Sequence, residues 1–211
     1  MPNGVWPYTH VLWKGRDRRA RFADLLFSFE LGMGGLHIVF VCTGNICRSP
    51  TAERLTAAYA ASRHLTEMSA SSAGTRAVVG QQIHPKAARV LRELGGDDSN
   101  FAARQFTARV ARTADLILTM TTDQRDTVLQ VVPQKLHRTF SLSEAAALVS
   151  ARGASTIADL ASLRGTLSSS LVTDIPDPIG EEDHAFVSVG RTISSLLTPV
   201  LSLCAGFSNG A

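Results

Sequence analysis

The chain contains 211 residues, of which 45% are hydrophobic and 18% are charged, so its size and composition fit one globular domain and exclude a disordered chain. Its three cysteines are too few for a disulfide-stabilised scaffold and favour a reducing compartment. The formal net charge is +3, and the sequence contains no continuous basic stripe, so we do not expect nucleic acid as a partner.

The sequence shows no obvious membrane or export segment, because we find no run that approaches the roughly 20 apolar residues of a membrane span. The best candidate, residues 22–41, contains Asp24, Glu30 and His37. It therefore predicts neither a membrane span nor a signal peptide. We expect a cytoplasmic protein without a membrane partner.

Residues 1–35 differ in composition from the rest of the chain. They contain both tryptophans, five basic and three acidic side chains, and a glycine-rich end. We interpret them as an N-terminal extension to a domain that spans residues 36–207 and is followed by a tail at 208–211. Two interpretations of the extension stay open: a short helix at 18–29, or a true start of the protein at Met33.

From residue 36 onward, short apolar runs alternate with stretches of helical periodicity. The apolar runs predict strands at 37–41, 68–73, 115–120 and 135–140. Helical spacing predicts helices at 50–64, 84–94, 122–132, 142–149 and 184–203. Residues 150–173 are rich in Ser, Gly and Ala and show no clear period. This alternation indicates βαβ units, so we predict a single α/β domain with a doubly wound parallel sheet of about four strands and helices on both faces.

The strongest chemical signal in the chain is the segment Cys42-Thr43-Gly44-Asn45-Ile46-Cys47-Arg48-Ser49. It directly follows the first predicted strand and precedes a helix that begins with a proline. In an open parallel sheet, ligands bind at the carboxyl ends of the strands. The N–H groups of such a loop and the positive end of the next helix together attract anions. The sequence therefore predicts a phosphate-binding loop at residues 43–49.

The side chains of this loop suit a covalent reaction at phosphorus. Gly44 permits a close approach of the backbone, and Asn45 tolerates a left-handed conformation. The planar guanidinium of Arg48 can hold two phosphate oxygens at once. The positive end of the helix, Arg48 and the Ser49 hydroxyl all favour a thiolate at Cys42. We therefore predict that Cys42 is a nucleophile held opposite a bound phosphorus atom.

A buried structural role is the alternative for both loop cysteines, because a free cysteine most often packs as a small hydrophobe. For Cys42 this alternative requires that Arg48, Ser49 and the position of the loop coincide by chance, and we set it aside. For Cys47 two interpretations stay open. It is either a core residue or the partner of Cys42 in a reversible disulfide that forms under oxidation.

The predicted reaction also needs an acid that protonates the leaving oxygen. Asp177 lies between Pro176 and Pro178, which stiffen the backbone. Its acidic neighbours and a bound phosphate dianion favour its protonated form, so we expect an acidic activity optimum. Asp174 is the rival candidate for the acid.

These residues resemble the low-molecular-weight protein tyrosine phosphatase family. The resemblance rests on the 42–49 loop and on the Asp177-Pro178 pair near the C-terminus. It covers residues 36–207, with smaller matches at 72–75, 103–105 and 118–120.

The resemblance implies a role for each residue of the site. Cys42 is then the nucleophile, Arg48 the ligand of the phosphate and of the transition state, and Asp177 the general acid and later the base. Asn45 and Ser72 hold the loop in shape, and the Ser49 hydroxyl stabilises the thiolate. The resemblance implies neither a metal nor another cofactor.

Three departures from the family pattern bear on the substrate. Many members carry aromatic residues after the Asp-Pro pair, where this chain has Ile179 and Gly180. Phe101 stands in place of a histidine that often supports the loop. Arginine phosphatases of the family typically have threonine at the position of Ile46, which favours phosphotyrosine over phosphoarginine here. Residues 143–173 are longer than the family needs, and residues 1–35 have no counterpart.

We therefore expect a phosphatase that hydrolyses phosphotyrosine-type monoesters through a phosphocysteine intermediate, with a phosphorylated protein or a small phosphoester as substrate. One alternative is a phosphatase for phosphoarginine or small phosphoesters. Another is a phosphate-binding or redox-sensing module with vestigial activity. Thioredoxin-coupled arsenate reductases share the fold and the loop, but they need two further cysteines, and the sequence has none between Cys47 and Cys204.

Overall fold

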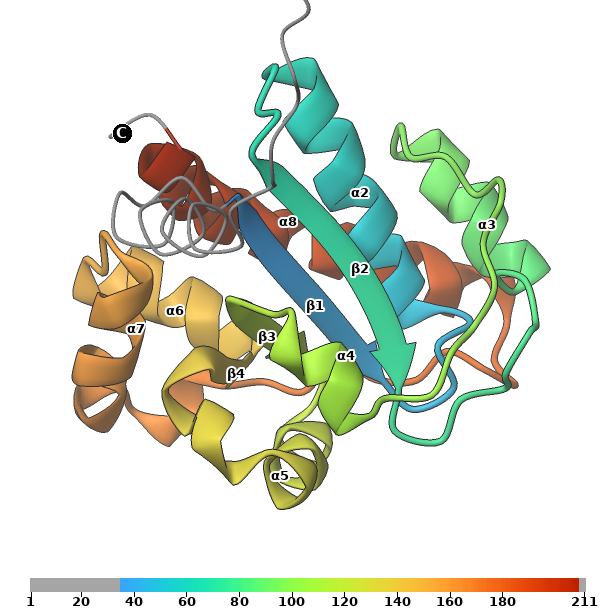
Figure 1. Cartoon of the computed structure of the whole chain (residues 1–211). Helices are drawn as coiled ribbons and strands as arrows, with labels where there is room; N and C mark the ends of the chain where they lie inside the picture. The colour runs from blue at the N-terminus through green and yellow to red at the C-terminus, as the bar shows by residue number, and fades with distance from the viewer. Residues whose placement is uncertain (1–34, 209–211) are drawn as a thin grey trace, which may run out of the picture. The chain divides into compact units, whose positions relative to one another are not determined.

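Four parallel strands form one sheet in the order β2-β1-β3-β4 in the computed structural model, which describes residues 35–208 (Figure 1). The strands are β1 (Leu36–Cys42), β2 (Met68–Gly74), β3 (Leu116–Thr119) and β4 (Thr139–Ser141). This confirms the predicted α/β class and the parallel, doubly wound sheet. Apart from residues 35 and 208, the predicted extension at 1–35 and the tail at 208–211 lie outside the described residues.

Seven α-helices and three short 3-10 segments connect or follow the strands within the described residues. The helices are α2 (Arg48–Ser62), α3 (Pro85–Glu93), α4 (Ala108–Arg112), α5 (Thr122–Val131), α6 (Leu142–Arg152), α7 (Ile157–Leu163) and α8 (Asp183–Ser208). The 3-10 segments are η1 (Pro133–Arg138), η2 (Arg164–Thr166) and η3 (Ser169–Leu171).

Alternate residues of β1 belong to separate cores on the two faces of the sheet. Ile38 and Phe40 join the large core that contains residues of α2, α3, α6 and α8. Val39 and Val41 join a smaller core with residues of α4 and α5. All four side chains are fully buried. Burial on both faces explains why the sequence of this strand is continuously apolar.

The predicted strand at 135–140 is wrong over most of its length. Residues 133–138 form η1, which begins at Pro133 and buries no residue. Of this stretch, only the residues of β4 (Thr139–Ser141) pair with β3, and all three are buried. Pro133 and the exposed side chains after it suit a turn on the surface, whereas the buried residues that follow suit a strand.

Two short helices, α4 and α7, escaped sequence-based prediction. Five or seven residues are too few for an apolar period to emerge. Each helix nevertheless begins at a capping threonine, because Thr107 accepts a hydrogen bond from Val110 N and Thr156 forms a capping box with Asp159. These capping threonines are the sequence signal from which the starts of the two helices could have been predicted.

By length and composition, α8 could cross a membrane, since Asp183–Gly206 contains an 18-residue window with a mean hydropathy of 1.3. This corrects the expectation that no stretch of the chain passes such a test. However, the apolar side of α8 is buried in the large core, where the helix packs against α2, α3 and α6. The burial identifies α8 as a core helix of this domain.

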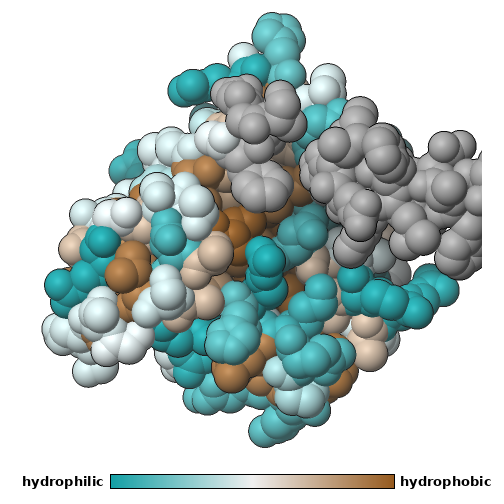
Figure 2. Space-filling view, turned by 60° about the vertical axis from the view of Figure 1, so that its left-hand side comes forward, coloured by the Kyte–Doolittle hydropathy of each residue, from teal (hydrophilic) through white to brown (hydrophobic). Residues whose placement is uncertain are grey.

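Arg164 anchors the segment between α6 and the C-terminal helix. Its Nε donates to Glu144 Oε1 at 2.9 Å, and one of its terminal nitrogens donates to the Leu136 carbonyl at 3.0 Å. Its guanidinium also lies 4.0 Å from the centre of the Phe140 ring. Glu144 is buried and accepts a further hydrogen bond from Arg125. On its surface, the side of the molecule that carries α7 shows a mixture of hydrophilic and hydrophobic residues (Figure 2).

We expect Glu144→Gln to lower the free energy of unfolding by about 2 kcal/mol, because Arg125 and Arg164 lose a buried carboxylate while the capping role of residue 144 is kept. Urea denaturation measures the change. Asp126→Asn is the matched control: it removes an exposed partner of Arg125 and should change stability by less than about 0.5 kcal/mol. Equal losses in the two variants would contradict a buried charge network.

Candidate active site

The predicted phosphate-binding loop joins the carboxyl end of β1 to the first turn of α2. The carbonyl groups of Cys42, Thr43 and Gly44 accept hydrogen bonds of 2.9–3.0 Å from backbone N–H groups of residues 75–78, which follow β2. The Ile46 carbonyl accepts one from His84 N at 2.7 Å. The loop is thus held from outside through its carbonyl oxygens. Asn45 N–H donates to Cys42 Sγ at 3.3 Å, and the other N–H groups of the loop are available for an anion.

Asn45 occupies the centre of the loop in the left-handed conformation, with φ 56°, as its residue type had indicated. The side chain is fully buried. Its Nδ2 donates to Ser49 Oγ at 3.0 Å and to Ser72 Oγ at 2.8 Å, and its Oδ1 accepts from Arg104 N at 2.8 Å. Asn45 and Ser72 therefore tie the loop to β2 and to the segment before α4.

The hydrogen bonds around Asn45 have a defined direction. Glu53 Oε2 lies 2.5 Å from Ser72 Oγ, and a carboxylate only accepts, so the Ser72 hydroxyl donates to it. Asn45 donates to both Ser72 and Ser49, so the Ser49 oxygen accepts from Asn45 and the Ser49 hydroxyl donates its own proton to a different acceptor. Cys42 Sγ lies 3.0 Å from Ser49 Oγ, whereas the other acceptor, a carbonyl of β2, lies at 3.5 Å. The chain of bonds that starts at Glu53 thus ends with a proton donated to the Cys42 sulfur.

We expect Glu53→Gln to lower kcat/KM about tenfold, because a glutamine amide can donate to Ser72 and so reverse the order of these hydrogen bonds. Alkylation of Cys42 by iodoacetamide at pH 7 should also be slower than in the parent protein. Glu67→Gln changes an exposed glutamate and serves as the control. An unchanged rate of alkylation in Glu53→Gln would contradict this role.

Arg48 is buried at the start of α2 and faces the segment that carries the predicted acid. One terminal nitrogen donates to the Ile175 carbonyl at 3.0 Å, and the other forms an ion pair with the Asp177 carboxylate. Ile175 N in turn donates to the Met120 carbonyl at the end of β3, at 2.9 Å. The Nε atom of Arg48 is buried and has no hydrogen-bond partner among the described residues. This donor is available to an anion in the loop.

The two candidate acids have different environments. Asp177 is 44% exposed and pairs with Arg48 at the loop. Asp174 instead accepts hydrogen bonds from Thr122 N at 2.8 Å and Thr122 Oγ1 at 3.3 Å, at the start of α5. The structure therefore brings Asp177 to Arg48 and engages Asp174 with the first residue of α5, whose N-cap is Thr121.

Cys47 lies in the large core and is buried. Burial raises the pKa of its thiol to about 12, and the nearby Cys42 and Asp177 contribute in the same direction. Burial likewise raises the pKa of Cys204 to about 12. Both side chains are therefore neutral thiols at physiological pH, which favours the core interpretation of Cys47.

We expect iodoacetamide to modify Cys42 in the native protein at pH 7, whereas Cys47 and Cys204 stay unmodified, because their raised pKa values keep the thiolate fraction negligible. Peptide mass spectrometry measures the modified fraction of each cysteine. Unfolding in urea supplies the control, since all three thiols should then react. Modification of Cys47 at the rate of Cys42 in the native protein would contradict the assignment.

Sequence analysis gave no role in shaping the loop to two residues, Gly74 and Gln124. A Cβ atom at Gly74 would lie 2.5 Å from the Thr43 carbonyl oxygen, so a side chain does not fit there. At Gly44, where we predicted a close approach of the backbone to the ligand, a Cβ atom would lie 3.5 Å from its nearest protein neighbour, in Ile46. The protein itself therefore leaves room for a side chain at this position. Gln124 of α5 donates to Thr43 Oγ1 at 3.0 Å. No sequence signal marked Gln124, because it is distant in the chain.

The surroundings of the loop are aliphatic rather than aromatic. Val78, which packs close to Gly44, is 47% exposed, and Ile179 after the Asp-Pro pair is 44% exposed. Ile46 of the loop is half-buried. Phe101, predicted to replace a supporting histidine, is buried beneath the Arg54 guanidinium, 5.6 Å from the ring centre.

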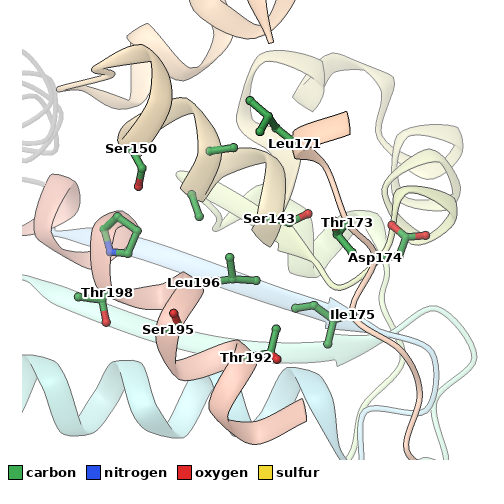
Figure 3. Close-up of a pocket in the computed structure, with 13 residues that line it drawn as sticks. Ser143, Ser150, Leu171, Thr173, Asp174, Ile175, Thr192, Ser195, Leu196 and Thr198 are labelled. Carbon is green, nitrogen blue, oxygen red and sulfur yellow. The ribbon is translucent and has the colours of Figure 1, made fainter. Parts of the chain in front are cut away.

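A separate cavity of about 660 Å³ lies between α6, α8 and the segment before the acid (Figure 3). Among the residues that the structure describes, Asp174 is the charged side chain of the lining, and no cation lines the cavity. This cavity therefore does not suit a phosphate group. Within residues 35–208, no cluster of three His, Cys, Asp or Glu side chains is placed to hold a metal ion.

A parallel α/β sheet whose first strand ends in a loop with a cysteine and an arginine, faced by an aspartate, is the architecture of small cysteine-dependent phosphatases. The sequence matches the family described as "Low molecular weight phosphotyrosine protein phosphatase" over residues 37–159, more than half of the chain. The chain belongs to this family, which confirms the resemblance seen in the sequence.

Relatives and solved structures agree with this assignment. A putative low molecular weight protein-tyrosine-phosphatase of Klebsiella pneumoniae is 30% identical over 156 residues, covering 74% of this chain and 88% of that protein. The phosphatase Wzb of Escherichia coli K12 is 40% identical over 98 residues, covering 46% of this chain and 63% of Wzb. The chain thus spans less than two thirds of the length of Wzb.

Solved structures of two phosphatases have the same fold. The tyrosine phosphatase AmsI of Erwinia amylovora has a TM-score of 0.61 at 27% identity and covers 80% of this chain and 92% of its own. The YwlE arginine phosphatase of Geobacillus stearothermophilus has a TM-score of 0.62 at 26% identity. This match covers 79% of the present chain and 91% of the YwlE chain. These likenesses confirm the predicted fold.

Proposed function

We propose that this protein is a metal-independent phosphatase that hydrolyses phosphotyrosine-type monoesters through a phosphocysteine intermediate. The observation that carries the proposal is the convergence of three side chains from distant parts of the chain. Cys42 Sγ lies at the base of the loop, Arg48 presents a buried Nε with no partner among residues 35–208, and Asp177 faces Arg48. Binding alone would need neither a nucleophile nor an acid.

In the first step, the Cys42 sulfur attacks the phosphorus atom. The S–P bond forms with an electron pair of the thiolate while the bond to the tyrosyl oxygen breaks. The leaving oxygen takes a proton from Asp177. Before the attack, the thiolate is stabilised by the Ser49 hydroxyl at 3.0 Å and by Asn45 N–H at 3.3 Å.

In the second step, the carboxylate of Asp177 accepts a proton from a water molecule that attacks the phosphorus. The S–P bond breaks, inorganic phosphate leaves, and Cys42 returns to the thiolate. Asp177 takes up the proton that the next cycle requires, so atoms and charge balance over the two steps.

Substrate binding has to rearrange the ion pair between Arg48 and Asp177. Phosphate oxygens compete with the carboxylate for the guanidinium, while the bond from Arg48 to the Ile175 carbonyl at 3.0 Å keeps the arginine in place. Once the carboxylate is displaced, the nearby phosphate dianion favours its protonated form. This supports an activity optimum at acidic pH.

Phosphotyrosine is the substrate that the surroundings of the loop support best. Ile46, Val78 and Ile179 offer apolar surface for an aromatic ring. Phosphoarginine is the second candidate, because the aromatic wall of many family members is missing and the fold is as similar to an arginine phosphatase as to a tyrosine phosphatase. We propose that the protein acts in the cytoplasm, where its three free cysteines stay reduced.

Hydrolysis of p-nitrophenyl phosphate in the presence of EDTA tests the proposed reaction. We expect full activity with EDTA, and a silent parent protein would instead support a phosphate-binding module. Matched phosphotyrosyl and phosphoarginyl peptides then test the substrate class. Faster turnover of the phosphoarginyl peptide would overturn the preference for phosphotyrosine.

A further inference from the structure

The segment that carries the proposed acid is held on both sides of that residue. Before it in the chain, the Ile175 carbonyl accepts a hydrogen bond from Arg48 at 3.0 Å. After it, the Glu181 carbonyl accepts a hydrogen bond from Lys86 Nζ, on the first turn of α3, at 3.1 Å. Asp177 lies between these two anchors.

The second anchor is a small group of charged side chains between α3 and α8. Lys86 Nζ also lies 3.0 Å from Asp183 Oδ1, and a terminal nitrogen of Arg89 donates to Asp183 Oδ2 at 2.8 Å. Both oxygens of this carboxylate, on the first residue of α8, are therefore engaged. The two hydrogen bonds, that from Lys86 first, hold the pKa of Asp183 below its ordinary value. We call Lys86, Arg89 and Asp183 the α3 clamp.

Helix α3 is fixed with respect to both the phosphate-binding loop and α8. His84 N, directly before the helix, donates to the Ile46 carbonyl of the loop at 2.7 Å. The His84 ring stacks on the Phe186 ring of α8, with centroids 5.0 Å apart and planes at 14°. A Cβ atom at Gly190 of α8 would lie 2.5 Å from Val90 Cγ1 of α3, so the two helices pack closely. The α3 clamp therefore sets the position of the acid segment relative to the loop that holds the phosphate.

The stretch between Asp177 and the α3 clamp is short and stiff. Pro176 and Pro178 fix their own φ angles on either side of the acid. Glu181 N donates to the Pro178 carbonyl at 3.0 Å, and Gly180 takes the left-handed conformation, with φ 92°, inside this turn. A shift of Glu181 is therefore passed on to Asp177 rather than absorbed by a flexible linker.

We propose that Lys86 is a positioning residue, which holds Asp177 beside the leaving oxygen of the bound substrate through the Glu181 carbonyl. This inference rests on the proposed function, in which phosphate oxygens displace the Asp177 carboxylate from Arg48. Once that ion pair is broken, the anchors at Ile175 and Glu181 determine where the acid lies. An ammonium group suits this role, because its three N–H donors serve a carbonyl and a carboxylate at the same time.

Lys86→Met tests the proposal, since methionine keeps an unbranched stem and removes the donors. For the full chain we expect kcat with a phosphotyrosyl peptide to fall about fivefold, because a misplaced acid transfers its proton less efficiently. Turnover of p-nitrophenyl phosphate, whose leaving group needs less protonation, should fall less than about twofold. Lys86→Arg keeps a cationic donor and should recover most of the lost rate. An equal loss in Lys86→Arg, or equal losses with both substrates, would overturn the proposal.

Lys135→Met is the matched control. Lys135 also donates to a backbone carbonyl, that of Ala114 at 2.6 Å, but this bond lies before the amino end of β3. We expect the control to leave both rates unchanged. A fivefold loss in the control that equals the loss in Lys86→Met would show that the effect is not specific to the acid segment, and would overturn the proposal.

Two further measurements separate positioning of the acid from other effects. In the Asp177→Asn protein, Lys86→Met should lower kcat no further, because Lys86 acts through the acid, and a second fivefold loss would contradict this. Hydrogen exchange of the backbone amides of residues 177–182 should be about fivefold faster in Lys86→Met than in Lys135→Met. This measurement requires no turnover, so equal exchange in the two variants would overturn the anchor even if the proposed hydrolysis is absent.

Discussion

Cys42→Ser should lower the turnover of p-nitrophenyl phosphate by about 10⁴-fold or more, the largest effect that we expect from any single substitution. A serine hydroxyl keeps its proton at neutral pH and is a far weaker nucleophile than a thiolate. The hydrogen bonds from Ser49 and Asn45, which stabilise a negative sulfur, give an uncharged hydroxyl little activation. No other side chain is placed to deprotonate residue 42 among the described contacts.

Phosphate binding separates loss of chemistry from loss of structure in this variant. Arg48 and the N–H groups of the loop are unchanged in Cys42→Ser, so the protein should still be protected by inorganic phosphate against thermal unfolding. Cys204→Ser is the control: it changes a buried cysteine in α8 and should leave kcat/KM within about twofold. Activity that survives Cys42→Ser would rule out the phosphocysteine intermediate.

The sequence was most informative where the functional residues are neighbours in the chain. The loop from Cys42 to Ser49 is continuous, and it lies between a strand buried on both faces and a helix that starts beside a proline. Local chemistry therefore sufficed to find both the nucleophile and the arginine. Asp177 was identified from its two flanking prolines and the family resemblance, because no periodicity links it to Arg48 across 129 residues.

The contacts that escaped prediction join residues that are distant in the chain. Gln124 reaches Thr43 across 81 positions, and Arg104 N reaches Asn45 across 59. Glu53 lies at the start of a directed hydrogen-bond chain, and this position depends on how β2 aligns with α2. Side chains of these types are common on protein surfaces, so nothing in their local sequence distinguishes them from solvated residues.

Asp177→Asn should lower kcat for phosphotyrosine about 10²-fold to 10³-fold, because asparagine has no proton to give to the leaving oxygen. The loss should be smaller for p-nitrophenyl phosphate, whose leaving group is a weak base and needs less protonation. This difference between substrates is specific to a general acid, since a misplaced Arg48 would slow both reactions equally.

Asp174→Asn provides a control of the same chemical type three positions earlier. Asp174 accepts from Thr122 N at the start of α5, so we expect a loss of about 1 kcal/mol in the free energy of unfolding and a kcat within about twofold of the parent. Asp177 is 44% exposed, so its substitution should affect stability less than activity. If Asp174→Asn slowed the hydrolysis of phosphotyrosine more than that of p-nitrophenyl phosphate, and Asp177→Asn did not, Asp174 would be the general acid. Such a result would mean that Asp177 serves only to hold Arg48 in the ligand-free protein.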